Sequence, residues 1–215
     1  MIRLIILDFD GTLADTRELI IFTNQEAQRR MGFPVCDEDT IVATIGLPLK
    51  ECILKMYPDL PAEAVPEWID KYRAVFDEMK GLFAPKLFPN VKTTMETLAG
   101  KGYVLSVASS RGRPSLMDFL HGMGIAPYIS YVLGAGDVTL AKPHPEPVLK
   151  TLRDLSFDAG EALVVGDMPV DILMGKSAGA RTCGVSYGNS SRKALLESGA
   201  DCVIDDFSEL VGIAD

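Results

Sequence analysis

The chain of 215 residues has no apolar run long enough to cross a membrane or to act as a secretion signal. Its opening stretch, Met1–Leu7, is short and reaches a carboxylate at Asp8. We therefore expect a cytoplasmic protein without a membrane partner.

Cysteine is scarce, and its spacing excludes two classes of site. The four cysteines form no C-x-x-C pair, so neither a zinc site nor a disulfide framework is expected; they are Cys36, Cys52, Cys183 and Cys202. Basic residues are outnumbered 21 to 30, giving a net charge of -9. A field of that sign repels nucleic acids and anionic membranes, so an anionic substrate needs a local positive site.

Hydrophobic residues make up 47% of the chain and charged ones 24%, as in ordinary globular proteins. Short apolar runs predict six strands: Ile2–Leu7, Tyr103–Ala108, Tyr131–Leu133, Ala162–Val165, Thr182–Val185 and Cys202–Ile204. Helical patterns lie between them, at Val91–Leu98, Pro114–Met123, Pro145–Leu155, Val170–Ala178 and Ser191–Ser198. Strands alternating with helices predict an α/β fold with a three-layer, Rossmann-like parallel sheet.

One segment, residues 16–85, interrupts this alternation because it is helical by pattern throughout. The expected helices are Arg17–Met31, Asp37–Ile45, Leu49–Met56 and Ala62–Met79. We expect a small all-helical domain at 16–85, inserted after the first strand of an α/β domain formed by 1–15 and 86–215.

Two carboxylates follow the first predicted strand directly, in the sequence Asp8-Phe9-Asp10-Gly11-Thr12-Leu13. Parallel sheets place their ligands at the carboxyl ends of strands. Asp8 and Asp10 can point to one side there, and their repulsion requires a cation or a shared proton. Hard carboxylate oxygens favour Mg²⁺. The alternative is a loop with solvated acids.

A second acidic pair, Asp167 and Asp171, follows the apolar run at Ala162–Val165. Asp8 and Asp167 could supply oxygen ligands to one magnesium ion. Asp171 could ligate through water, hold a neighbour in place, or complement the dipole of the helix that begins there.

Candidate groups for an anion stand at two further places. Lys142-Pro143-His144-Pro145 puts a lysine ahead of a helix, where it could neutralise a phosphoryl group and a carboxylate; His144 is expected to be structural or exposed. Ser109-Ser110-Arg111 ends the second long strand, where hydroxyl and backbone donors could bind oxygens. Taken singly, each of these two segments could also be an ordinary loop whose polar side chains are solvated.

In this order, Asp8–Leu13, Ser109, Lys142-Pro143 and Gly166-Asp167 with Asp171 resemble the four motifs of the haloacid dehalogenase superfamily. The resemblance covers essentially the whole chain, and the helical insertion looks like the cap of its phosphoglycolate phosphatase and β-phosphoglucomutase branch. It implies a phosphatase that acts on a small phosphorylated metabolite, as a monomer or weak homodimer. A phosphosugar mutase and a pyrophosphatase remain open, as does a binding protein without turnover; a dehalogenase is disfavoured because Asp10 is present.

The resemblance also implies roles for single residues. Asp8 would be the nucleophile and Asp10 the general acid and base. Mg²⁺ would be held by Asp8, the Asp10 carbonyl and Asp167, while Ser109 and Lys142 bind phosphoryl oxygens and Asp171 supports them. Further candidates for substrate binding are Gly11, Thr12, Ser110, Arg111 and the cap residue Lys50, with Arg17 and Asn24 on the first cap helix.

The sequence departs from the family pattern at two places. Met168-Pro169 replaces a small polar residue after Asp167, so a hydrogen bond beside the metal is expected to be missing or replaced. Ser110-Arg111 stands where many relatives have asparagine and lysine, and its guanidinium could lie near the phosphate or point to solvent.

Overall fold

A computed structural model describes residues 1–214, and its main sheet contains six parallel strands in the order β5-β4-β1-β6-β7-β8. The strands are β1 Leu4–Leu7, β4 Val104–Gly112, β5 Tyr131–Ala135, β6 Ala162–Gly166, β7 Arg181–Val185 and β8 Cys202–Ile204. The predicted parallel α/β sheet is confirmed, and each strand lies where an apolar run predicts it.

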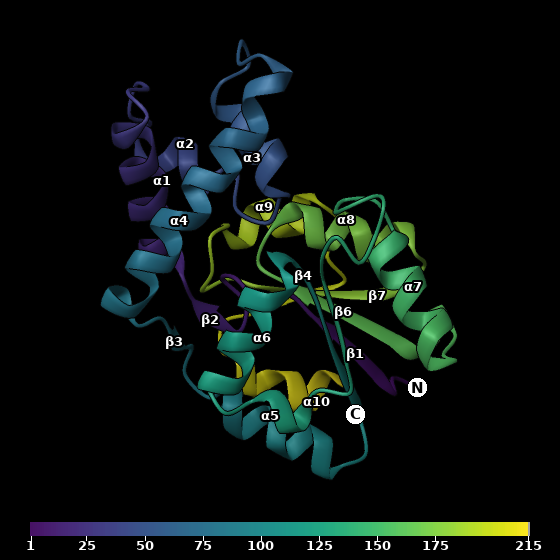
Figure 1. The fold of residues 1–215 in the computed structure, drawn as a ribbon. Helices are drawn as coiled ribbons and strands as arrows, with labels where there is room; N and C mark the ends of the chain where they lie inside the picture. Colours follow the sequence, from purple (N-terminus) through teal and green to yellow (C-terminus); the bar gives the residue numbers. More distant parts are fainter. Residues whose placement is uncertain (215) are drawn as a thin grey trace.

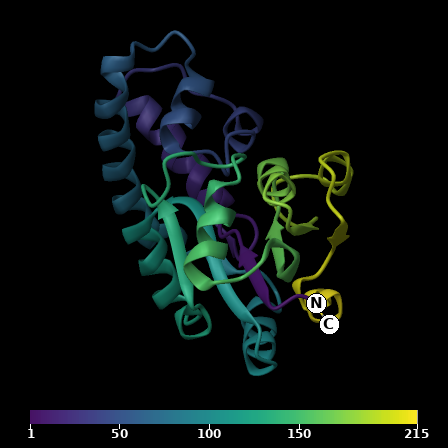
Figure 2. The ribbon, with the colours of Figure 1, turned by 90° about the vertical axis from the view of Figure 1, so that its right-hand side faces the viewer.

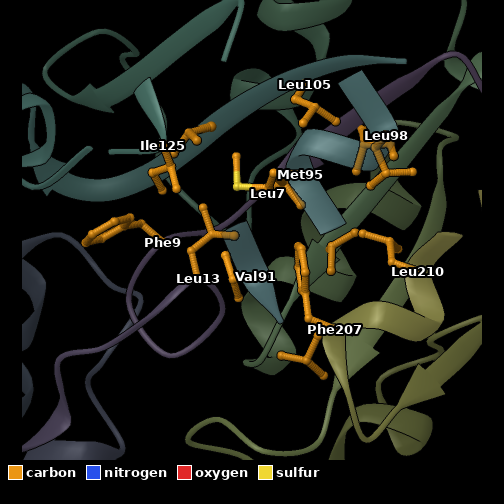
Figure 3. Close-up of a cluster of buried hydrophobic side chains, with 14 of the residues drawn as sticks. Leu7, Phe9, Leu13, Val91, Met95, Leu98, Leu105, Ile125, Phe207 and Leu210 are labelled. Carbon is orange, nitrogen blue, oxygen red and sulfur yellow. The ribbon is translucent and has the colours of Figure 1, made fainter. Parts of the chain in front are cut away.

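Helices cover both faces of this sheet, because the central strands are apolar on both sides (Figure 1). In β1, Ile5 and Leu7 pack into one cluster and Leu4 and Ile6 into another. Figure 3 shows side chains of the first cluster, among them Leu7, Met95 and Leu210. The helices on that face are α5 Val91–Gly100, α6 Arg113–Gly122 and α10 Leu210–Ala214. Those opposite are α7 Glu146–Leu155, α8 Pro169–Ser177 and α9 Arg192–Glu197.

Four helices follow the short strand β2 and precede β3: α1 Arg17–Arg30, α2 Glu38–Val42, α3 Leu49–Met56 and α4 Val65–Phe83. We call them the cap helices. Both chain connections between them and the sheet pass through an antiparallel ribbon of β2 (Ala14–Asp15) and β3 (Lys86–Leu87). Figures 1 and 2 show the cap helices gathered at one end of the molecule. They have an apolar core of their own, centred on the fully buried Trp68.

Local details differ from the sequence pattern. α2 ends at Val42, three residues early, because the chain tightens into turns there and Gly46 takes a φ of 91°. α4 starts after a 3₁₀ turn and runs on to Phe83. The 3₁₀ turns are Ala62–Ala64, Ala126–Tyr128, Ala159–Glu161 and Phe207–Glu209. Within residues 1–214, no helix combines the length and apolar character that a membrane crossing requires.

Candidate active site

A buried lysine joins two acidic segments that lie far apart in the sequence. Lys142 Nζ donates to Asp8 Oδ1 at 2.6 Å and to Asp171 Oδ1 at 2.7 Å. Asp8 follows β1 and Asp171 lies in the first turn of α8, after β6, which is the neighbour of β1. The lysine side chain is only 2% exposed, so this is an ion-pair triad removed from water. The structure therefore brings the motifs of Asp8, Lys142 and Asp171 together.

Asp171 holds the lysine rather than pointing into solvent. Its second oxygen accepts the backbone N–H of Met168 at 3.1 Å, which also closes the first turn of α8. Two of the roles considered above, supporting a neighbour and complementing the helix N-terminus, are thus filled by one carboxylate.

Asp167 lies at the carboxyl end of β6 and is held by neutral donors. Thr12 Oγ1 donates to its Oδ1 at 2.9 Å, and the backbone and side-chain amides of Asn189 donate to Oδ2 at 2.8 and 2.9 Å. A side chain at Gly11, whose φ is 91°, would collide with Asp167 and Asn189. Thr12 thus donates a hydrogen bond to Asp167, and Gly11 leaves the space that the Asp167 side chain occupies.

Burial dominates the electrostatics of the cluster. It raises the pKa of Asp8, against the lowering effect of Lys142, and Asp171 and Asp167 raise it further. Burial, and then the charge of Asp171, raises the pKa of Asp167 to about 7. Burial disfavours the charged form of Lys142, but the pKa of the lysine is raised because Asp171 and Asp8 outweigh that effect. When Asp8, Asp167 and Asp171 are all ionised, their negative charge exceeds the positive charge of Lys142.

The residues present fit a hard divalent cation. Carboxylate oxygens of Asp8, Asp167 and Asp171 come within 4.8 Å of one another. Asp8 Oδ2 is buried and has no hydrogen-bond partner among the described residues, and an orphaned anionic oxygen in such a place calls for an ion or a ligand. Asp171 accepts from Lys142 and Met168, and Asp167 accepts only from the neutral donors of Thr12 and Asn189, so Asp8 Oδ2 and the Asp167 carboxylate are the oxygens best suited to Mg²⁺.

Asp10 is held by a pair of residues that the sequence patterns do not connect with it. Arg111 donates from Nη2 to Oδ1 at 2.5 Å and from Nε to Oδ2 at 3.1 Å, and Thr16 Oγ1 donates to Oδ1 at 2.7 Å. The guanidinium therefore does not point to solvent, one of the two alternatives raised by the sequence, since its side chain is only 9% exposed.

Ser109 and Ser110 occupy an irregular part of β4. Ala108 pairs with Leu133 and Gly112 with Ala135, so β4 carries extra residues between these positions. Ser109 Oγ accepts the N–H of Arg111 at 3.1 Å, which leaves its hydroxyl proton for another acceptor. Ser110 donates to the carbonyl of Gly46, in the cap, at 2.6 Å. The bulge thus gives one serine to the site and the other to the cap.

A cavity of about 210 Å³ lies beside these residues, between the cap and the sheet. Ser109, Ser110 and Lys142 line it from the core, and Lys50 and Glu51 line it from the cap. Lys50 lines the cavity and is also exposed to solvent. Arg17 is exposed, and Asn24 is buried within the cap, where its amide donates to Ile20 O.

Sequence reasoning missed Thr16 and Asn189. Thr16 lies shortly after the first motif. The only sequence signal for its contact with Asp10 was a hydroxyl side chain six residues further along the chain. Asn189 lies after β7 in a Gly-Asn-Ser-Ser run, which marks a loop but not its target. His144 is exposed, as expected, and all four cysteines are free thiols.

The fold and the site together define an enzyme of the α/β class, with acids and a lysine gathered at the carboxyl ends of parallel strands beneath a helical cap. A family profile for haloacid dehalogenase-like hydrolases matches residues 5–185. The chain belongs to this family, and the resemblance seen in the sequence motifs is confirmed.

Individual relatives agree with this assignment. The chain is 39% identical to a Dickeya dadantii protein named as a probable phosphatase, IndB, over 98% of this chain and 93% of that one. It is 31% identical to the pyrophosphatase PpaX of Bacillus pumilus, over 99% and 96% of the two chains. It is 30% identical to a Yersinia pseudotuberculosis phosphoglycolate phosphatase, over 98% and 92%.

Solved structures match along the whole length. A haloacid dehalogenase-like protein from Bacteroides fragilis superimposes with a TM-score of 0.92 at 26% identity, covering 98% of this chain and all of that one. A predicted phosphoglycolate phosphatase from Haemophilus somnus gives 0.85 at 26% identity, covering 100% and 98%. These matches include both the sheet and the cap.

Proposed function

We propose that the protein is a magnesium-dependent phosphatase that hydrolyses a small phosphomonoester in the cytoplasm. The observation that carries the proposal is the buried Lys142, bonded to Asp8 and Asp171 beside Asp167. This arrangement offers a carboxylate oxygen next to a fixed cation, as nucleophilic attack on phosphorus requires. Phosphatases among the relatives support the reaction class.

In this mechanism Asp8 attacks phosphorus and forms an aspartyl phosphate, while Asp10 protonates the leaving oxygen and then activates water. Lys142 and Ser109 bind phosphoryl oxygens, and both line the cavity. Asp8, Asp167 and the backbone carbonyl of Asp10 would hold Mg²⁺. The ion would supply charge stabilisation for the transferring group.

The cavity favours a small leaving group. About 210 Å³ accommodates a few heavy atoms beyond the phosphoryl group, and Lys50 at its wall favours a carboxylate or a second phosphate. Phosphoglycolate and pyrophosphate each meet this description, and relatives carry the names of both activities. Phosphoglycolate is our first choice, with pyrophosphate as the second candidate.

The test is release of inorganic phosphate from p-nitrophenyl phosphate, phosphoglycolate and pyrophosphate, with and without Mg²⁺. Asp8→Asn should lower the rate at least about a thousand-fold, because it removes the nucleophile. Asp77→Asn, which breaks only an exposed pair with Lys80, is the matched control and should keep full activity. An Asp8→Asn protein as active as the wild type would refute the proposed function.

A further inference from the structure

Arg111 is the only cation that the structure places on the carboxylate of Asp10 within residues 1–214. Its side chain is 9% exposed and that of Asp10 12% exposed, so water screens the pair weakly. We infer that Arg111 is a positioning residue that couples the cap to the orientation of Asp10. The inference rests on the proposed function, in which Asp10 transfers the proton to the leaving oxygen.

The donors on Asp10 are distributed unequally between its two oxygens. Oδ1 accepts from Thr16 at 2.7 Å, from Arg111 Nη2 at 2.5 Å and from Arg111 Nε at 3.2 Å. Oδ2 accepts from Arg111 Nε alone among the described residues, at 3.1 Å. With Oδ1 saturated, Oδ2 is the oxygen left to carry a proton to the leaving group and to receive one from water.

The guanidinium in turn lies against three phenyl rings, one from the cap and two from the core, of which Phe9 is the more distant at 5.9 Å. Its central carbon lies 5.0 Å from the ring centre of Phe76, on α4, and 5.0 Å from that of Phe119, on α6. The two rings meet edge to face at 6.2 Å. Cation–aromatic contacts of this kind are strongest when both groups are desolvated.

Phe76 brings the position of the cap into this arrangement. It stacks on Tyr72, one turn earlier on α4, which stacks on the buried Trp68. A displacement of α4 would therefore move the ring away from Arg111, and the guanidinium would lose the one of its three ring contacts that comes from the cap. The arginine would then be held less firmly on Asp10, so proton transfer is most efficient when the cap is seated on the core.

A series of leaving groups tests the inference. The alkoxide of an alkyl phosphate is a poor leaving group and needs the proton from Asp10, whereas p-nitrophenolate leaves without protonation. In Arg111→Ala, kcat/KM for an alkyl phosphate should fall about 100-fold, the low end of a general-acid contribution, and for p-nitrophenyl phosphate less than about 5-fold. Free guanidinium should restore part of the alkyl phosphate activity, and ammonium at the same concentration should not.

Matched variants separate positioning from general structural damage. Arg113→Ala removes a neighbouring, exposed arginine paired with Asp137 and should leave both substrates unaffected. Phe76→Leu keeps an apolar side chain but removes the ring, and should reproduce the selective loss at a smaller size. Phe22→Leu, a phenylalanine paired with Phe83, should show no selectivity between substrates.

Two results would overturn the inference while leaving the proposed function intact. An equal loss on both substrates in Arg111→Ala would mean that the arginine serves binding or folding. A gain in activity would mean that it restrains Asp10. If the wild-type protein hydrolysed neither substrate, the proposed function itself would fail.

Discussion

At the scale of single residues, the centre of the molecule is a lysine whose charge is balanced within 3 Å by two carboxylates. Removing one partner from such a buried group leaves a charge that the protein cannot solvate. Without Asp171, Lys142 would keep Asp8 as its one carboxylate partner and its ammonium group would be less firmly positioned beside the nucleophile.

We therefore expect Asp171→Asn to lower kcat by roughly 10- to 100-fold, the usual range for a residue that supports a reacting group. Unfolding in urea should show a loss of about 1.5–3 kcal/mol for a hydrogen bond to a charged group. Steady-state kinetics and urea titration measure the two effects. A variant with normal kcat would show that Asp171 does not support Lys142 in turnover.

The site residues that could be predicted are those in short sequence motifs that follow one another in a characteristic order. Asp8, Lys142 and Asp167 follow or precede regular elements, so a parallel sheet brings them to one edge whatever their side-chain torsions. Arg111 could not be placed in this way, because a bulge in β4 and the packing of Phe9, Phe76 and Phe119 determine where its guanidinium lies.

At the scale of elements, the loop after α2 fastens the cap to the core. Gly46 has a φ of 91° and its carbonyl accepts from Ser110, and a side chain added there would lie 3.2 Å from Val170. Both the backbone conformation and the tight approach favour glycine. This loop and the Phe76 ring contact the core at different points.

Gly46→Ala should therefore lower kcat/KM by about tenfold, since a strain of roughly 1–2 kcal/mol would fall on the seated cap. Gly32→Ala is the matched control, because Gly32 also has a positive φ in the cap but nothing lies within 4 Å of its added carbon. The control should lose stability without losing activity. Equal kinetic losses in both variants would contradict a specific role for the loop.

Strand positions were readable from the sequence because buried parallel strands are continuous apolar runs. The ribbon of β2 and β3 was not, since strands of two residues have no periodicity to detect. α2 was predicted too long for a related reason. The apolar pattern continues through Ile45, whose side chain is buried, but Ile45 lies in a turn after the end of the helix.

At the scale of the whole molecule, the proposed magnesium site predicts a link between metal binding and stability. The pKa of Asp167 is raised to about 7 in the folded protein by burial and by Asp171. Below that pH the carboxyl holds a proton, which must leave before a cation can bind. The stabilisation that this proton gives the metal-free protein is complete at low pH and is lost as pH rises through about 7.

The melting temperature should consequently rise more with Mg²⁺ at pH 8 than at pH 5.5. Saturation at 100 times the dissociation constant adds about 2.7 kcal/mol to the free energy of unfolding. Thermal unfolding with Mg²⁺ and with a chelator measures the difference. A larger Mg²⁺ effect at pH 5.5 would contradict the assignment of Asp167 as a ligand.

The central claim is that Asp8 carries the phosphoryl group during turnover. The most direct measurement is acid quenching of Asp10→Asn with p-nitrophenyl phosphate, followed by mass spectrometry of its peptides, because the loss of the general base should let the intermediate accumulate. The account predicts a hydroxylamine-sensitive phosphoryl group on the peptide that contains Asp8. A phosphoryl group on another residue, with turnover retained in Asp8→Asn, would contradict it.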